Sequence, residues 1–297
     1  MLVPPPLRPG DLIDIVAPSS PCNKTLALRG MGWLHERYRV RFDPTMWTAA
    51  GYLAGNDDRR IAELDRALRA HDSKAVVAVR GGYGLHRVAP RVEFRSLLSY
   101  PKWLVGFSDA TVLHVEASAT GVASMHASMV TALGRGDEHA RSQWIDMLEH
   151  PLRLRRWSDL SVVTPGHALG TSFGGNLTVL HACAAAGRLR IPDNTILLIE
   201  DVDEHPYRID RMLTTLRLGG YFDRVVGIVV GEFTSCAPGP DNVSAYEVVG
   251  DVLGALGIPV VSGFPIGHGA RNDPIPLGVR VEIAAMQEPA QVLLGAR

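Results

Sequence analysis

The first half of the chain alternates short apolar runs with stretches in which apolar residues recur at helical spacing. The apolar runs are typical of strands and lie at residues 12–17, 38–42, 75–79 and 103–107. The helical patterns between them lie near residues 25–37 and at 59–70, where the sequence reads RRIAELDRALRA. Strands and helices in turn indicate a parallel sheet with helices on its faces. A run as apolar as AVVAV, at 75–79, is typical of a strand that is buried on both sides.

The pattern weakens in the middle of the chain and then resumes. Residues 135–170 contain one modest helical pattern, followed by charged residues, Pro and Gly without clear periodicity. Beyond them the pattern predicts strands at 195–200 and 225–233, helices near 176–187, 207–218 and 245–256, and Pro- and Gly-rich strands to the end. On a prior of about 150 residues per domain, we expect two domains, residues 1–150 and 151–297.

The composition is that of an ordinary globular protein. Hydrophobic residues make up 46% of the chain and charged residues 21%, far from the balance of a disordered chain. The 30 Lys and Arg against 31 Asp and Glu give a formal charge of −1, which provides no electrostatic attraction for nucleic acid or an acidic membrane. We therefore expect small-molecule or protein partners, with no nucleic acid and no membrane.

Cysteine usage favours a reducing compartment. Cys22, Cys183 and Cys236 form no CxxC pair and leave one thiol odd, so they predict neither a disulfide framework nor a zinc site. The N-terminal segment MLVPPPLRPG has no basic region followed by an apolar run, and no apolar run reaches the ~18 residues that a membrane span needs. The expected location is the cytoplasm.

Ser108 lies where a buried strand ends and a helical pattern begins, in the sequence WLVGFSDATVLH. Ligands of open parallel sheets bind beyond the carboxyl ends of the strands. A sharp turn from strand to helix also exposes a hydroxyl group, as in a nucleophile elbow. A serine before a helix is also a common N-cap, and this position by itself favours that interpretation.

The segment VRGGYG, from Val79 to Gly84, also follows a predicted strand. Paired glycines let backbone N–H groups approach a ligand or a developing oxyanion, although a plain turn fits the same residues. The chain contains neither GxGxxG nor GxxxxGK followed by Ser or Thr, so nucleotide binding lacks its usual signatures.

Glu200 ends another buried strand and opens a cluster of carboxylates with Asp201, Asp203 and Glu204. Such a cluster could bind a divalent cation. The spacing is not that of an EF-hand, however, and a solvated acidic turn before a helix explains most of the cluster. Glu200 differs from the others because a carboxylate at a strand end is expected to be partly buried and to need a partner.

His268 lies between glycines in GFPIGHGARND, where an imidazole can extend from the backbone of a loop. His114, His126 and His205 are alternatives, and a core or surface position would account for any of the four. The zinc spacings HExxH and HxxxH are absent from the sequence, so a zinc hydrolase is not expected.

A serine, a glutamate and a histidine in these positions fit one chemical arrangement. A nucleophilic hydroxyl needs a base, and the base needs an orienting carboxylate. Ser108 belongs to the first predicted domain, whereas Glu200 and His268 belong to the second. We therefore expect the active site in a cleft between the two domains.

The sequence resembles the LD-carboxypeptidases, or muramoyl-tetrapeptide carboxypeptidases, a family of serine peptidases. The motifs that carry the resemblance occur in order along nearly the whole chain: LRPGDLIDIVAPSSP, VRGGYG, GFSDAT, GGNL, LLIEDVDEHPYRIDRML, and PIGHG followed by PLG. One departure is His126-Ala127-Ser128-Met129, where the family often has His-Gly-Pro-Met, which puts the shape of that loop in question but not the triad.

The resemblance implies specific roles. Ser108 would be the nucleophile, His268 the general base and Glu200 the orienting acid, with an oxyanion hole formed by the backbone N–H groups of Gly82 and Asp109. It implies no metal and no organic cofactor. The expected fold is α/β, with a doubly wound parallel sheet in the N-terminal domain and a smaller mixed or barrel-like C-terminal domain.

The implied reaction is hydrolysis of the L,D amide bond that releases terminal D-alanine from murein tetrapeptide during peptidoglycan recycling. The family also includes microcin C resistance proteins, so cleavage of a peptidyl or aminoacyl nucleotide is an alternative. A binding module without catalysis, in which SFGGN and VRGGYG hold a peptide or a sugar, is a third interpretation. We also expect a homodimer, although the sequence does not determine the oligomeric state.

Arg80 and Arg208 are candidates for holding substrate carboxylates, because a guanidinium group can hold a carboxylate with two parallel hydrogen bonds. For Arg208 the alternative is a structural pair with Asp201, Asp203 or Asp210.

Overall fold

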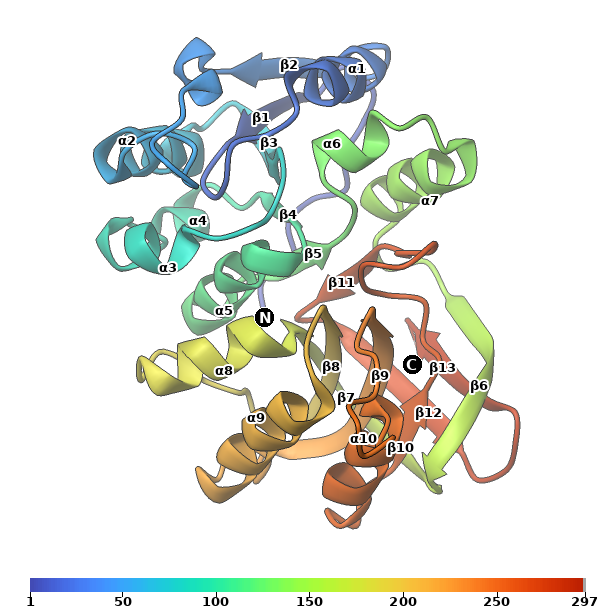
Figure 1. Ribbon diagram of the computed structural model, residues 1–297. Helices are drawn as coiled ribbons and strands as arrows, with labels where there is room; N and C mark the ends of the chain where they lie inside the picture. Colours follow the sequence, from blue (N-terminus) through green and yellow to red (C-terminus); the bar gives the residue numbers. More distant parts are fainter. Residues whose placement is uncertain (296–297) are drawn as a thin grey trace. The chain divides into compact units, whose positions relative to one another are not determined.

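The computed structural model describes residues 1–295, so the last two residues of the predicted second domain, 296 and 297, lie outside the described residues. The chain forms two compact units. The first contains Met1–Pro151 and Asp273–Pro276, and the second contains Leu152–Asn272 and Leu277–Arg297. Figure 1 labels the helices and strands of both units.

The first unit is built on a parallel sheet. Its strands are β1 (Leu12–Val16), β2 (Arg39–Phe42), β3 (Ser73–Ala78), β4 (Trp103–Gly106), β5 (Ser124–His126) and β11 (Ile275–Leu277). They lie in the order β11-β5-β4-β3-β1-β2, and the pairs from β2 to β5 are parallel. The carboxyl ends of the neighbouring strands β3 and β4 therefore meet at one edge of the sheet.

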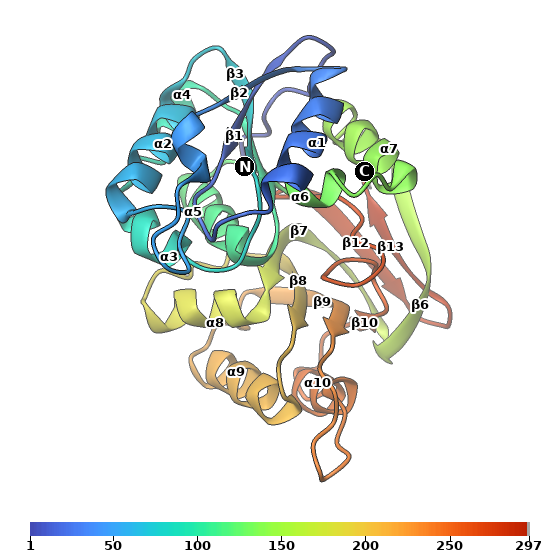
Figure 2. The same cartoon turned by 45° about the horizontal axis from the view of Figure 1, so that its top comes forward.

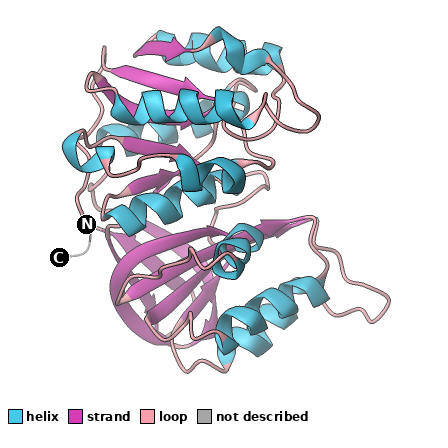
Figure 3. Cartoon of the chain, turned by 90° about the vertical axis from the view of Figure 1, so that its left-hand side faces the viewer, coloured by secondary structure: helices cyan, strands magenta, loops and turns pink. Residues whose placement is uncertain are grey.

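Helices cover both faces of this sheet. On one side lie α1 (Lys24–His35), α6 (Val130–Leu133) and α7 (Glu138–Glu149), and on the other α2 (Asp57–Arg69), α3 (Leu85–Val88), α4 (Ser96–Ser99) and α5 (Thr111–Thr120) (Figure 1). Short 3-10 turns are η1 (Pro44–Trp47), η2 (Ala89–Arg91) and η3 (Ser108–Ala110). Figure 3 shows helices stacked in front of the strands of this unit.

The local sequence explains these elements. All of β1 and β4 is buried, as expected for strands covered on both faces. Helix α2 begins after Asn56, whose side chain accepts a hydrogen bond from the N–H of Arg59. Its first turn is acidic and its last turn basic, which complements the helix dipole.

The second unit is a closed barrel with helices outside it. Its strands are β6 (Arg155–Thr164), β7 (Gly166–Asn176), β8 (Thr195–Val202), β9 (Val225–Thr234), β10 (Val260–Ser262), β12 (Arg280–Ala285) and β13 (Ala290–Leu294), in the order β10-β6-β13-β12-β7-β8-β9. The pairs β7–β8, β8–β9 and β9–β10 are parallel, and β6, β12 and β13 pair in antiparallel fashion.

Three helices belong to this barrel unit within residues 1–295: α8 (Leu177–Ala185), α9 (Pro206–Leu218) and α10 (Ala245–Gly254). They lie outside the parallel strands β8 and β9 (Figure 2). The predicted fold class, a doubly wound sheet followed by a mixed, barrel-like domain, is confirmed.

Two features differ from the sequence pattern. The weakly periodic region at 155–176 forms the long strands β6 and β7. Within β6, Leu160 is buried while its other positions are half-buried or exposed, so the apolar alternation that marks a strand is missing there. Asp273–Pro276 also belongs to the first unit instead of the second, because β11 pairs with β5 at the edge of the parallel sheet.

Within residues 1–295, none of the helices combines the length and the apolar character that crossing a membrane requires.

Candidate active site

Ser108 lies in a strained turn at the carboxyl end of β4. Its φ of 61° is in the left-handed region, which a residue other than glycine rarely adopts. Phe107 before it is extended, and Phe107 is also the residue that caps η3, so Ser108 does not act as the N-cap. Backbone strain of this kind concentrates at functional sites. The geometry is that of a nucleophile elbow.

Hydrogen bonds from the neighbouring strand and helix hold this turn. The carbonyl oxygen of Gly106 accepts from the N–H of Ala127 at 3.1 Å and lies 3.0 Å from Nε2 of the buried His114. The other ring nitrogen of His114 lies 2.9 Å from Oγ of Ser124. His114, an alternative base in the sequence, is thus engaged on both ring nitrogens in the core.

The loop at residues 126–129, where the sequence departs from the family's usual His-Gly-Pro-Met, packs against the Ser108 turn. Ala127 is buried, and its N–H group bonds to Gly106 directly before the Ser108 turn. The carbonyl oxygen of Ser128 accepts from Nε1 of Trp144 at 3.0 Å. His126 is buried at the end of β5, and its ring lies 5.7 Å from that of Phe107. These contacts give the Ala127-Ser128 segment a packed, structural setting.

The glycine loop, residues 81–84, follows β3 and contacts Ser108. A Cβ atom on Gly81 would lie 3.0 Å from both Cβ and Oγ of Ser108, so a side chain there would push Ser108 aside by a few tenths of an ångström. Gly82 has a φ of +108°, and a Cβ there would lie 2.4 Å from Oγ of Ser20. That hydroxyl in turn accepts a hydrogen bond from the N–H of Tyr83 at 3.2 Å.

Asp109, directly after Ser108, has a buried carboxyl group. Its Oδ2 accepts a hydrogen bond from the N–H of Leu85 at 3.0 Å. Burial raises the pKa of Asp109, although the hydrogen bonds that it accepts oppose the rise. The side chain thus links the turn that carries Ser108 to the end of the glycine loop.

Glu200 and His268 form a hydrogen-bonded pair in the second unit. Nδ1 of His268 lies 2.8 Å from Oε2 of Glu200, which is fully buried at the end of β8. Because the carboxylate can only accept, Nδ1 carries the proton, and in the neutral imidazole Nε2 holds the lone pair of a base.

The pair perturbs both pKa values. Burial raises the pKa of Glu200, opposed by the hydrogen bond from His268. Burial alone would lower the pKa of His268, but the hydrogen bond to Glu200 and the charges of Glu200, Asp201 and Asp203 raise it above the usual 6.5. A histidine with a carboxylate partner is one arrangement that suits acid–base catalysis near neutral pH.

The loop that carries His268 is fitted around Glu232, which lies near the end of β9. The N–H of Glu232 donates to the carbonyl oxygen of Ile266 at 2.9 Å. A Cβ on Gly269 would lie 1.4 Å from Oε2 of Glu232, so this carboxylate occupies the space beside the glycine. The N–H of Gly267 donates to Oδ1 of Asn272 at 3.1 Å. The glycines beside His268 therefore serve close packing.

Asp201 has a structural role at the start of α8. Its carboxylate accepts from Nδ2 of Asn176 at 2.9 Å, and from the N–H and the hydroxyl of Thr178 at 2.9 and 2.8 Å. Within residues 1–295 there is no group of three or more His, Cys, Asp or Glu that could hold a metal ion.

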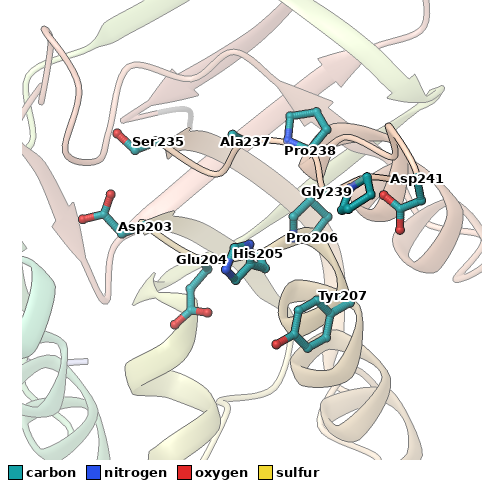
Figure 4. Close-up of a pocket in the computed structure, with 11 residues that line it drawn as sticks. Asp203, Glu204, His205, Pro206, Tyr207, Ser235, Ala237, Pro238, Gly239 and Asp241 are labelled. Atoms are coloured by element: carbon teal, nitrogen blue, oxygen red, sulfur yellow. The ribbon is translucent and has the colours of Figure 1, made fainter.

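A pocket of about 500 Å³ lies in the second unit, beyond the carboxyl ends of β8 and β9. Figure 4 shows its lining, which comes from the segments Asp203–Tyr207 and Ser235–Asp241. Carboxylates of Asp203, Glu204 and Asp241 contribute to this lining.

The two candidate arginines are exposed. Nη1 of Arg80 donates to the carbonyl oxygen of Pro21 at 2.9 Å. Nε of Arg208 lies 3.2 Å from the hydroxyl of Tyr207, and its Nη1 lies 3.6 Å from Oε2 of Glu204. The ion-pair partner of Arg208 is therefore Glu204, whereas the structural alternative named Asp201, Asp203 or Asp210. His205, the remaining alternative histidine, stacks on Tyr207 with 5.8 Å between ring centroids.

The structure thus gathers the predicted residues in two groups. Ser108, Gly82, Asp109 and Arg80 belong to the first unit, and Glu200, His268 and Arg208 belong to the second. Sequence reasoning missed Glu232 and Ser20. It also missed Arg60 of α2, which is fully buried and donates to the carbonyl oxygen of Gly84 in the glycine loop. The serine pair after β1, Ser19 and Ser20, was a signal that could have pointed to Ser20. Arg60 left no such signal, because a charged residue in an amphipathic helix looks like a surface residue until its burial is known.

Comparisons with known proteins agree across the chain. A family model described as the LD-carboxypeptidase N-terminal domain matches residues 13–127, and one described as the LD-carboxypeptidase C-terminal domain matches residues 169–283. A putative carboxypeptidase of Synechocystis is 38% identical over 292 residues, which cover 95% of this chain and 94% of that protein. A probable murein peptide carboxypeptidase of Bacillus subtilis is 31% identical, with 97% and 93% covered.

Solved structures of similar proteins share the fold of this chain. The crystal structure of a muramoyltetrapeptide carboxypeptidase from Oxalobacter formigenes superposes with a TM-score of 0.86 at 28% identity, covering 96% of this chain and 99% of that one. The Escherichia coli microcin C7 self-immunity protein MccF is 24% identical over 94% of this chain and 92% of its own. A structure of MccF in complex with glutamyl sulfamoyl guanosine has a TM-score of 0.89 at 21% identity, covers 100% and 99%, and shares the fold.

Proposed function

Because this chain belongs to the LD-carboxypeptidase family, we propose that it is a serine carboxypeptidase that releases terminal D-alanine from murein tetrapeptide by hydrolysing an L,D amide bond. The observation that carries the proposal is the strained turn that presents Ser108 beside the glycine loop, with a φ of 61° at the end of a parallel strand. Membership of the family supports serine carboxypeptidase activity. The murein substrate and the roles of the individual residues are what we propose.

The proposed triad is Ser108, His268 and Glu200. Nε2 of His268 accepts the proton from Oγ of Ser108 as the oxygen attacks the carbonyl carbon between the L-centre of meso-diaminopimelate and D-alanine. Glu200 holds Nδ1–H of His268, with 2.8 Å between the heavy atoms, and stabilises the imidazolium that forms.

The remaining steps complete the hydrolysis. The tetrahedral oxyanion is stabilised by the backbone N–H groups of Gly82 and Asp109. His268 then gives its proton to the amine of D-alanine, the C–N bond breaks, and an acyl enzyme remains on Ser108. Water, deprotonated by His268, attacks the ester, and its proton passes to Oγ of Ser108 as the tripeptide leaves.

The names of the relatives support the substrate class. Proteins that are 31% and 33% identical to this chain are described as murein peptide and murein tetrapeptide carboxypeptidases, the second from Pseudomonas aeruginosa over 76% of this chain and 78% of its own. We keep Arg80 and Arg208 as proposed holders of substrate carboxylates. Both are exposed, so each can exchange its present partner for a ligand.

The deciding experiment measures D-alanine release from purified murein tetrapeptide. We expect turnover by the native protein, and a loss of several orders of magnitude in Ser108→Ala by analogy with the ~10⁶-fold cost of removing a triad serine. Circular dichroism and thermal melting of the variant are the controls for folding. A variant that keeps a tenth of the native rate would rule out Ser108 as nucleophile.

Cleavage of an aminoacyl nucleotide is the second candidate, favoured by the similarity to MccF over 94% of this chain. The same preparations should be incubated with glutamyl sulfamoyl guanosine. Hydrolysis of this compound, with no D-alanine released from tetrapeptide, would assign the alternative. Binding of either compound without any turnover would favour the peptide- or sugar-binding module.

We also propose that the protein works in the cytoplasm and as a homodimer. Within residues 1–295, Cys22, Cys183 and Cys236 form no disulfide bond, which suits a reducing compartment. Cell fractionation tests the location, and sedimentation at working concentration tests the oligomeric state.

A further inference from the structure

The carboxyl group of Asp109 is buried beside the proposed nucleophile, and the reaction steps above use only the backbone of that residue. Asp109 is 2% exposed. Its Oδ2 accepts the N–H of Leu85, which follows the glycine loop, at 3.0 Å. A buried carboxyl group that bonds to the neighbouring loop connects the two segments that would carry the oxyanion donors.

The other side of the glycine loop is held as well. Arg60 is fully buried, and its Nη1 donates to the carbonyl oxygen of Gly84 at 2.8 Å and to that of Pro18 at 2.5 Å. Oγ of Ser20 accepts from the N–H of Tyr83 at 3.2 Å. Residues 83, 84 and 85 are therefore each fixed by a different side chain.

Such fixation matters because the loop has no regular structure of its own. Gly82 and Gly84 both have positive φ, at +108° and +140°, a conformation that no helix or strand would maintain. Oxyanion donors act through a preorganised position, and a displacement of about 0.5 Å already weakens them. Gly82 follows Gly81, the glycine that approaches Ser108, and its N–H can keep a fixed position only if the residues around it are anchored.

We propose that Asp109 is a positioning residue for the reaction: its side chain ties the glycine loop to the Ser108 turn, so that the N–H groups of Gly82 and Asp109 form one rigid oxyanion site. This inference rests on the proposed function, since it needs an oxyanion beside Ser108. It assigns to the Asp109 side chain a role apart from that of its backbone. The hydrogen bond to Leu85, and not the negative charge, carries the effect.

The test compares three variants of the full chain with the native protein. Asp109→Ala and the similarly sized Asp109→Leu remove the acceptor, and the second keeps the site filled if the alanine variant folds poorly. Asp109→Asn keeps an oxygen that can accept from Leu85. The matched control is Asp14→Ala, because Asp14 is another buried carboxylate of the first unit, 1% exposed, that pairs with Arg41 instead of the glycine loop.

Two measurements separate positioning from general stability. Amide hydrogen exchange over residues 80–86 reports on the loop, and kcat and KM per folded molecule report on the oxyanion site. For Asp109→Ala and Asp109→Leu we expect exchange at least tenfold faster and kcat lower by about 10²-fold, with KM within threefold, because an oxyanion site acts in the transition state. Asp109→Asn should keep most of the protection of the loop from exchange and most of kcat. Asp14→Ala should lower the melting temperature while exchange over residues 80–86 and kcat stay native.

Three results would overturn the proposal. The first is amide exchange over residues 80–86 that stays native in Asp109→Leu. The second is faster exchange in that variant while its kcat stays native. The third is an Asp109→Asn variant whose exchange and kcat are as impaired as those of Asp109→Ala. If the native protein releases no D-alanine, the proposed function fails separately. The rate at which a fluorophosphonate modifies Ser108, which needs the same N–H groups but no murein peptide, then decides the positioning role together with exchange.

Discussion

Glu200 and Glu204 are four residues apart and have different surroundings, which makes them a matched pair for testing the orienting carboxylate. Glu200 is fully buried against His268, whereas Glu204 lines a pocket and lies 3.6 Å from the exposed Arg208. Glu200→Gln should keep the shape but lose the charge that stabilises the imidazolium, and kcat should fall roughly 10⁴-fold by analogy with the triad carboxylate. Glu204→Gln should cost far less.

Steady-state kinetics of the two glutamine variants on the same substrate check this ranking. If Glu204→Gln were the more damaged enzyme, the orienting role would move to Glu204 and the argument from the strand end would fail.

His114 should make the stability of the first unit depend on pH. It is fully buried, and burial lowers its pKa to about 4 from the usual 6.5. Between these two pKa values the histidine is protonated in the unfolded state and neutral in the folded state. The free energy of unfolding should therefore decline as pH falls from about 6.5 towards 4, by roughly 3 kcal/mol at most from this one group. Urea unfolding at pH 7 and pH 4.5 measures the decline.

The matched variant is His114→Gln, which can still donate to the Gly106 carbonyl but cannot take up a proton. It should be less stable than the native protein at pH 7 and should show a smaller loss between the two pH values. An equal loss in both proteins would show that other groups control the acid sensitivity.

At the level of structural elements, the loop after β10 depends on small residues around His268. Gly269→Ala would place a methyl group 1.4 Å from Oε2 of Glu232, so either the loop or the Glu232 side chain must move. The end of the Glu232 side chain is flexible and can turn aside, so we expect overpacking to cost only about 1 kcal/mol and kcat to fall by no more than about tenfold. Gly250→Ala in α10, where a Cβ meets nothing within 4 Å, is the control: kcat should stay near native, and stability should rise by about 0.5–1 kcal/mol because alanine favours a helix.

The cause can be isolated with a second substitution. Glu232→Ala removes the group that the new methyl meets, so the double variant should recover part of the loss in Gly269→Ala. No recovery in kinetics or melting temperature would show that the damage arises elsewhere in the loop.

For the whole molecule, the proposed reaction fixes the direction of the pH dependence. His268 must be neutral to accept the proton of Ser108, and Glu200 raises its pKa above 6.5. Activity should therefore fall as pH falls through this raised pKa, so the acid limb of kcat/KM should lie above the usual histidine pKa of 6.5. The stability that the pair contributes runs the other way, because a raised histidine pKa stabilises the fold at low pH and loses this effect as pH rises.

A kcat/KM profile from pH 5 to pH 9 measures the limb. In Glu200→Gln the residual activity should have its acid limb at lower pH, because the negative partner is gone. A limb at the same pH in both enzymes would assign the titration to a group other than His268.

The sequence by itself determined much of the first unit, because its signals are local. The runs at 75–79 and 103–107 became β3 and β4, since strands buried on both faces must be continuously apolar. Ser108 and the glycines at 81–84 were recognisable because turns after such strands require special residues. The family followed from motifs distributed along the chain, and the comparisons confirm it.

The tertiary structure decided what depends on distant partners. In strand β6 only Leu160 is buried, and the buried residues of β7 are largely glycine or polar, so neither strand shows an apolar alternation. Both strands exist because the barrel closes through their backbone pairing. Asp273–Pro276 joins the first unit because β11 finds an edge at β5. The hydrogen bond from Leu85 to Asp109 and the fit of Gly269 against Glu232 likewise join residues 24 and 37 positions apart, since burial and hydrogen bonding act through space and leave no periodic signal in the chain.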